Sequence, residues 1–195
     1  MRYPAEHKQE TRKRILRAAA RRIRSRGSEG AAIGDLMRDL HLTHGGFYRH
    51  FESKSDLLVE AFEEGHGEFL HRVASALQRA PKGGEIKALI DTYLDIEHCE
   101  NAADGCPVAA LATELARHSP RSRARIAFEK VLKSRTAELA KFMPGATEEE
   151  RLQKTRMLMS GMAGTLMVAR VLTDRERKKR FLDGAKKFYL KAVGG

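Results

Sequence analysis

Apolar positions recur every three or four residues along most of this chain, and no segment shows the strict alternation of a half-buried strand. One stripe of the first predicted helix consists of Ile15, Ala18, Ala19 and Ile23. Gly27 supplies a stop signal after it, and residues 33–40 repeat the helical spacing over a shorter length. The pattern predicts an all-α fold.

Polar caps and prolines mark further helix ends. Ser53 with Asp56 resembles a capping box that opens a long helix, and Thr147 with Glu150 repeats this arrangement. Residues 85–98 are expected to form one helix. Two prolines are predicted at first helical positions: Pro107, behind Cys106, and Pro120, behind Ser119. With final helices expected over 148–172 and 174–192, about nine helices result.

Residues 32–51 show the pattern of a helix-turn-helix. The apolar seam between its two helices is predicted to contain Leu36, Leu40, Leu42, Phe47 and Phe51. His41 falls at the turn, where a left-handed backbone is often required. Thr43 is expected to cap a very short second helix, whose N-terminal amides suit a phosphate oxygen. Gly45 and Gly46 would let this backbone lie close against DNA.

Four polar side chains around the second helix are candidate DNA contacts. Tyr48, Arg49 and His50 can donate hydrogen bonds to phosphates, and Arg49 can also reach a guanine edge. Lys54, at the start of the next helix, adds another phosphate contact. The predicted DNA-binding residues are Thr43, His44, Gly45, Gly46, Tyr48, Arg49, His50 and Lys54.

The segment 42–58 resembles the DNA-binding signature of the TetR family of bacterial transcriptional regulators. The matching positions are Leu42, Thr43, Gly45, Gly46, Phe47, Tyr48, Phe51, Ser53, Lys54 and Leu57. The resemblance covers about residues 8–65. Three residues depart from the family pattern: Met37 replaces a small alanine, His41 replaces glycine, and Ala32 replaces a capping Ser or Thr. These changes affect packing and remove a cap worth roughly 1 kcal/mol.

The resemblance implies a homodimeric regulator, expected to be a repressor of a near-palindromic double-stranded DNA operator and to be released by a small-molecule effector. Residues 1–55 would bind DNA, and residues 56–195 would hold the effector and dimerise. The sequence is compatible with a dimer built from the last two helices, because residues 152–172 carry much apolar surface and Gly161 and Gly164 permit close approach. The final helix adds a stripe formed by Phe181, Ala185 and Phe188.

Charge supports a polyanionic partner at one end of the chain. The net charge is +11, and residues 1–26 hold ten basic against two acidic residues, a balance of +8. A solvated helix face would show the same excess. No apolar run approaches the roughly 18 residues that span a bilayer, the first residues lack a secretory pattern, and two cysteines suit a reducing compartment. The expectation is a cytoplasmic protein without membrane contact.

Cys106 is the one candidate for chemistry. At a helix N-cap its thiolate would be favoured, which suggests sensing of oxidants or electrophiles; the alternative is a buried core residue. His98 and Cys99 lie near it in sequence, but their spacing does not match a metal site, so no metal or cofactor is expected. The alternatives to a regulator are a helical protein-interaction adaptor and, less favoured, an enzyme using Cys106 with His98 or His118.

Two further features concern the ligand-binding part. Gly65 and Gly67 fall inside the predicted connecting helix and suggest either a hinge or a simple kink or helix end. Candidate walls of a ligand pocket are Phe69, Tyr93, Phe128 and Met143.

Overall fold

The computed structural model describes residues 5–194 and contains no strand within that range. The α-helices of this range are α1 (Ala5–Arg26), α2 (Ile33–Asp39), α3 (Lys54–Arg79), α4 (Glu85–Tyr93), α5 (Ile96–Glu100), α6 (Pro107–Leu115), α7 (Arg123–Ala140), α8 (Glu148–Val171) and α9 (Arg175–Ala192). Three short 3-10 segments are η1 (Gly27–Ala31), η2 (His44–Arg49) and η3 (Ala102–Asp104). The predicted all-α fold is confirmed; residues 1–4 of the predicted DNA-binding domain lie outside the described range.

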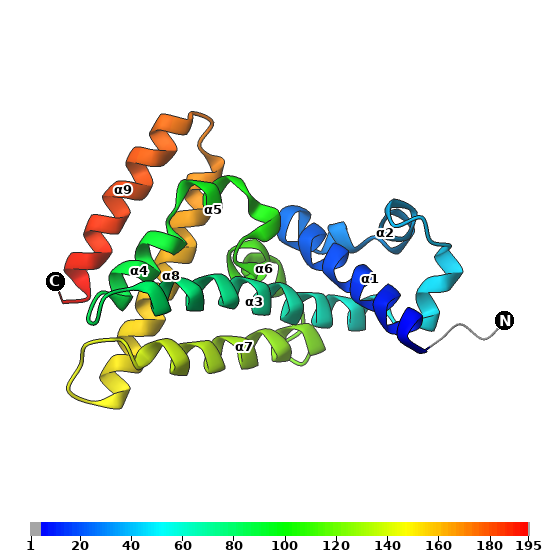
Figure 1. Cartoon of the computed structure of the whole chain (residues 1–195), viewed down its shortest axis with the longest axis horizontal. Coiled ribbons are helices and arrows are strands. Elements are labelled where there is room, and N and C mark those ends of the chain that lie inside the picture. Colours follow the sequence, from blue (N-terminus) through cyan, green and yellow to red (C-terminus); the bar gives the residue numbers. More distant parts are fainter. Residues whose placement is uncertain (1–4, 195) are drawn as a thin grey trace.

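The molecule is elongated, with α1, α2 and η2 at one end and α9 at the other (Figure 1). The long helix α3 runs between the two ends and joins them, while α7 lies alongside it (Figure 1). No helix among residues 5–194 combines the length and apolar character needed to cross a bilayer.

The N-terminal end has its own apolar core, which we call the head core. It includes the predicted stripe of α1 and the predicted seam, in which Leu36, Phe47 and Phe51 are buried. Leu57, Ala61 and other residues from the start of α3 complete it. Two residues of α6 also belong to this core: Leu111 and Leu115. The head is therefore packed against the larger part of the molecule through α6 as well as α3.

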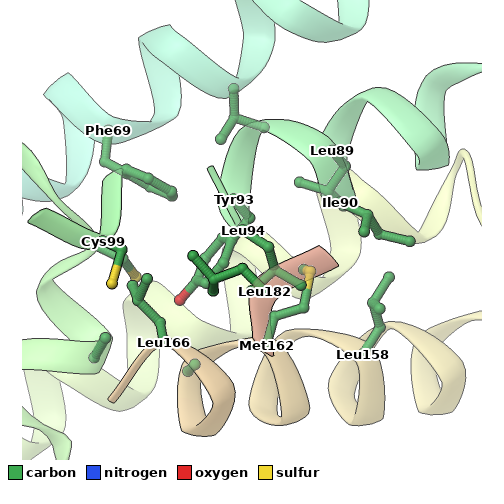
Figure 2. Packing of buried hydrophobic residues seen from close by; sticks show 14 of the residues in the cluster. Phe69, Leu89, Ile90, Tyr93, Leu94, Cys99, Leu158, Met162, Leu166 and Leu182 are labelled. Carbon is green, nitrogen blue, oxygen red and sulfur yellow. The ribbon is translucent and has the colours of Figure 1, made fainter. Parts of the chain in front are cut away.

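A second apolar core, the body core, lies among α3, α4, α8 and α9. Figure 2 shows Leu158, Met162 and Leu166 of α8 projecting toward the side chains of α4. Phe69 of α3 and Leu182 of α9 approach the same cluster from other sides. Since α3 contributes to both cores, it is the structural link between the two ends of the chain.

Most predicted helix boundaries are confirmed. Ser53 accepts a hydrogen bond from the Asp56 amide, and Thr147 accepts one from the Glu150 amide. The predicted helix over 85–98 is wrong: it breaks after Tyr93, because Asp95 is extended and its carboxylate caps the amide of Glu97 at the start of α5.

The prediction for Pro120 is also wrong. The helix begins at Arg123, and Ser122 caps it by accepting from the Arg125 amide. Pro120 lies in the turn before this cap, where the Ser119 hydroxyl already accepts from the Arg121 amide. The prediction for Pro107 is confirmed, with Cys106 at the N-cap of α6.

The helix α3 does not end at either glycine of its interior. Gly65 is buried, and a Cβ there would lie 3.0 Å from the guanidinium of Arg24 on α1. The Gly65 carbonyl accepts a hydrogen bond of 2.8 Å from the same group. Gly67 faces open space. Gly65 is thus a site of close packing between α1 and α3, and the helix-end alternative is wrong.

Candidate nucleic-acid interface

The turn between α2 and η2 has the backbone that the sequence predicts. His41 has φ of 57°, and it is the only non-glycine residue with positive φ among residues 5–194. This left-handed residue lets the chain reverse, so that the Leu42 amide donates 2.8 Å to the Met37 carbonyl. Histidine tolerates a conformation for which glycine is the easier choice, and the helix-turn-helix geometry is formed.

The segment η2 is a tight 3-10 turn preceded by extended Thr43. The predicted hydroxyl cap at Thr43 is wrong, since its side chain makes no capping hydrogen bond. The physical reason lies in the tight winding: the Gly46 amide, which a hydroxyl cap would satisfy, donates 3.0 Å to the Thr43 carbonyl instead. Thr43 is exposed, and its hydroxyl is not used as a cap.

Aromatic packing fixes η2 against the head core. Phe47 is fully buried, and its ring stacks on Phe51 with centroids 5.4 Å apart. Tyr48 meets the edge of Phe47 at 5.2 Å but leaves 60% of its surface exposed. Phe47 and Tyr48 therefore point in different directions: Phe47 anchors η2 in the head core, and Tyr48 is exposed to solvent.

The two glycines of η2 have different surroundings. A Cβ on Gly45 would meet no atom within 4 Å, so this backbone faces open space. A Cβ on Gly46 would lie 3.3 Å from the Thr43 hydroxyl oxygen and 3.7 Å from the Met37 methyl. The large side chain of Met37, buried beneath η2, thus occupies space beside Gly46. Only Gly45 presents bare backbone to an approaching molecule.

The predicted DNA-binding residues separate into two groups. Exposed residues, which a duplex can contact, are Thr43, His44, Gly45, Tyr48, Arg49 and Lys54. Gly46 and His50 are only partly exposed, and the Nδ1 atom of His50 is buried without a hydrogen-bond partner among the described residues. Burial lowers the pKa of His50, with smaller contributions from the charges of Lys8, Arg12 and Arg49. At neutral pH His50 is therefore an uncharged part of the scaffold.

Two basic residues of α1 belong to this surface and were not singled out by the sequence. Exposed Lys8 lies close enough to His50 for its charge to act on the imidazole. Arg12 holds η2 in place: its Nε donates 3.2 Å to the His50 carbonyl, and its Nη2 donates to both carboxylate oxygens of Glu60, at 2.7 and 2.5 Å. Their spacing of four residues puts both on one face of α1, a signal present in the sequence.

Replacing Arg12 with methionine should lower the free energy of unfolding by about 2 kcal/mol. The change removes the bonds to His50 and Glu60 and the contact of the guanidinium with the Phe51 ring, 4.6 Å from its centroid. Urea titration followed by circular dichroism measures it. Exposed Arg14 on the same helix is the matched control; an equal loss in Arg14→Met would contradict the role given to Arg12.

Cys106 and its neighbours form a structural cluster. The neutral imidazole of His98 donates from Nδ1 to the Tyr93 carbonyl at 2.6 Å, and its Nε2 accepts from the Cys106 amide at 3.0 Å. Burial lowers the pKa of His98 to about 4. Both ring nitrogens are therefore committed to backbone groups and neither is available as a base for the thiol. No group of three His, Cys, Asp or Glu side chains between residues 5 and 194 is placed to hold a metal.

A cavity of about 830 Å³ lies between α6, α7 and α8, a volume usual for small-molecule sites. Its apolar wall includes Val108, Phe128, Leu132, Leu152, Met159, Ala163 and Met167. Tyr93, Cys106 and Arg135 form its buried polar part. Of the candidate pocket residues, Tyr93 and Phe128 line it, whereas Phe69 and Met143 are buried in the body core and do not.

The outer face of α8 and α9 carries exposed apolar side chains. Its members are Met157, Val168, Val171, Phe181 and Phe188. Gly164 faces open space, which leaves room for another backbone, whereas a Cβ on Gly161 would collide with Tyr189 of α9 within the same chain. The two glycines therefore serve different contacts, and only Gly164 is free to meet a partner helix.

The sequence of this chain is similar to those of bacterial transcriptional regulators. Residues 15–61 match the family model described as bacterial regulatory proteins, tetR family. A protein of Mycobacterium tuberculosis (strain H37Rv), named as an uncharacterised HTH-type transcriptional regulator, is 30% identical over 170 residues, covering 84% of this chain and 86% of the relative. The HTH-type transcriptional regulator AcrR of Shigella flexneri is 38% identical over 55 residues, which are 28% of this chain and 26% of AcrR.

Solved structures agree in fold across nearly the whole chain. A TetR transcriptional regulator from Chloroflexus aurantiacus has a TM-score of 0.74 at 23% identity, covering 94% of this chain and 96% of the other. One from Legionella pneumophila has a TM-score of 0.76 at 20% identity, covering 94% and 97%. At these identities the likeness concerns the fold, and it extends beyond the helix-turn-helix to the helical body.

Proposed function

Since this chain belongs to the TetR family of bacterial regulatory proteins and is a DNA-binding transcriptional regulator, not an enzyme, we propose that it acts as a homodimeric repressor released by a small molecule. In this proposal the residues up to about 55 bind a double-stranded operator, and residues 56–195 dimerise and hold the effector. The protein would act in the cytoplasm, where its DNA lies.

The observation that carries this proposal is the arrangement of η2. Its buried Phe47 packs on Phe51, which follows η2, and anchors the segment, while Gly45 offers bare backbone and Tyr48 is exposed to solvent. Thr43, His44, Arg49 and Lys54 are exposed around it. Such a surface fits a major groove: hydroxyls and cations meet phosphates, and Arg49 reaches a base edge. We assign Gly46 and His50 to support of this surface.

A dimer through α8 and α9 would present two copies of η2. The exposed apolar face of these helices supports this assignment, because association removes it from water. Two identical heads related by a two-fold axis require two half-sites, about one or more helical turns apart, and thus a near-palindromic operator.

Release would begin in the cavity between α6, α7 and α8. An effector that binds there more tightly in a second subunit arrangement shifts the population toward it, and the spacing of the heads changes. Cys106 lines this cavity with only 1% exposure, so a thiol-reactive compound would reach it by entering the same space. Oxidant sensing at Cys106 stays a prediction on this basis.

Selection from random duplex DNA with the purified protein tests the repressor proposal. Sequencing of the bound fragments should give an inverted repeat, and a reporter gene placed behind that repeat should be silenced when the protein is expressed. Enrichment of a site without symmetry would contradict the dimer, and increased reporter output would contradict repression.

Affinity for the selected operator should fall steeply with salt. Log affinity against log salt should be linear, with a slope of about −0.9 for each phosphate contacted. Fluorescence anisotropy of a labelled duplex between 50 and 300 mM potassium chloride measures the slope, and Lys54→Gln should make it shallower by about one unit. A slope near zero would show that the exposed cations around η2 do not meet the backbone.

A further inference from the structure

Arg135 of α7 is a buried cation without an anionic partner. Its exposure is 3%, and it forms no ion pair with any described residue. Its Nη1 atom lies 3.4 Å from Nδ1 of His66 on α3, and its guanidinium lies 4.8 Å from the centroid of the Phe69 ring. Because arginine only donates, His66 accepts; burial, followed by the Arg135 charge, lowers the pKa of His66 to about 3. The contact is thus with a neutral ring.

Arg24, the other buried arginine among residues 5–194, shows that Arg135 lacks a carboxylate partner. The Arg24 side chain is fully buried, but its Nη2 donates a hydrogen bond of 2.5 Å to the carboxylate of Glu68 and its Nη1 donates to the Gly65 carbonyl. Two carboxylates, those of Glu129 and Glu148, also line the cavity, yet both residues are exposed and neither forms an ion pair with Arg135. A buried charge without a counter-ion is destabilising. The buried guanidinium of Arg135 therefore suggests that an anion binds beside it.

The unused donors of Arg135 are arranged for a planar anion. Nε and Nη2 are the atoms without hydrogen-bond partners, and they form the side edge of the guanidinium. Two parallel N–H groups on that edge match the two oxygens of a carboxylate. The third nitrogen, Nη1, is already occupied by His66, which fixes the orientation of the fork.

A second unused donor lies nearby. The Tyr93 hydroxyl is buried and has no oxygen or nitrogen hydrogen-bond partner among the described residues; the neighbouring Cys106 thiol is a weak acceptor. Burial raises the pKa of Tyr93, the neighbouring Cys106 raises it further, and the charges of Arg135 and Arg170 oppose this. Tyr93 and Arg135 are therefore near each other, and both line the same cavity. Around them the cavity is mostly apolar.

We propose that the effector of this regulator is a small organic acid with an apolar body, whose carboxylate is bound by the Nε–Nη2 edge of Arg135 and by the Tyr93 hydroxyl. The methionines and Phe128 of the cavity wall would contact the apolar body. This assignment rests on the proposed function, since it names the chemical class that the proposed effector cavity takes. A carboxylate there replaces the missing counter-ion of Arg135.

Calorimetric titration of the full-length protein without DNA tests the assignment. Three acids serve as probes, decanoate, 4-phenylbutyrate and 1-naphthoate, each compared with its own primary amide. At least one acid should bind about 10- to 100-fold more tightly than its amide, the range expected for a charge-assisted bidentate pair. In Arg135→Met this preference should disappear, while Lys133→Gln, which removes an exposed cation of the same cavity and helix, should retain it.

Equal binding of acid and amide across the panel, no binding of any acid, or an acid preference that survives in Arg135→Met would each overturn the assignment. The comparison of acid with amide uses the unaltered protein, so it decides the question even if Arg135→Met does not fold. Because no DNA is present, failure here leaves the operator, dimer and repression experiments intact, and failure of those leaves this result standing.

Discussion

Replacing Gly45 with leucine should abolish operator binding while leaving the fold unchanged. A Cβ at this position meets no atom of the protein within 4 Å, and its φ lies outside the left-handed region, so the folded chain accommodates the side chain. The same side chain would occupy the space through which η2 approaches a duplex. We expect operator affinity to fall by about 100-fold or more, roughly 3 kcal/mol, with the free energy of unfolding within about 0.5 kcal/mol of the parent.

Fluorescence anisotropy measures the operator affinity, and urea unfolding measures the free energy of unfolding. The matched control is Gly67→Leu, because Gly67 also faces open space but lies on α3 away from η2. It should keep full operator affinity and gain up to about 1 kcal/mol from helix propensity. Operator binding by Gly45→Leu at parental affinity would show that DNA does not approach this backbone, and the interface would have to lie elsewhere.

The second large effect should come from the face of α8 and α9. Val171 is 79% exposed and Phe188 is 66% exposed, the largest exposures among the big apolar residues of the described chain. Changing both to aspartate would place two charges from each subunit in the proposed dimer contact, and we expect dimer affinity to fall by about 1000-fold, roughly 4 kcal/mol. Operator affinity should fall about 100-fold or more, because each head would then bind a half-site without the other.

Sedimentation velocity measures the loss of dimer affinity, and fluorescence anisotropy measures the loss of operator affinity. Phe142→Asp provides the control, since Phe142 is 43% exposed and lies just after α7, outside the proposed contact. This variant should remain dimeric and bind the operator normally. A dimeric Val171→Asp, Phe188→Asp protein would exclude this face as the contact and leave its apolar residues without a role in association.

Local signals account for what the sequence predicts well. Three correctly predicted features are the left-handed backbone at His41 and the caps at Ser53 and Thr147. Each depends on residues within a few positions of each other, so the sequence pattern alone predicts it. The failures are also local in origin. At Thr43 the winding of η2 gave the Gly46 amide to a carbonyl, and at Asp95 a competing side-chain acceptor ended a helix that periodicity alone would continue.

Contacts between distant segments account for what the sequence conceals. The pairing of Arg135 with His66 joins residues 69 positions apart, and neither position suggests the other. A weaker signal does exist: Arg135 follows Phe128 and Leu132 and precedes Leu139 at helical spacing, so it interrupts an apolar stripe of α7. A single cation on an apolar stripe indicates a buried charge. Whether that charge has a counter-ion can be seen only in the structure.

Because α3 is one continuous helix, a tilt of the whole helix at one end displaces its other end. Its 26 residues span about 39 Å at 1.5 Å per residue, with one end in the head core and the other in the body core. Tilting a rod of that length by about 5° displaces its far end by about 3 Å, close to the rise of one base pair. Gly65 and His66 contact Arg24 and Arg135 from adjacent positions on α3. In the proposed release, a small displacement of the cavity wall at α7 would therefore be enough to shift the helix-turn-helix out of register with its half-site.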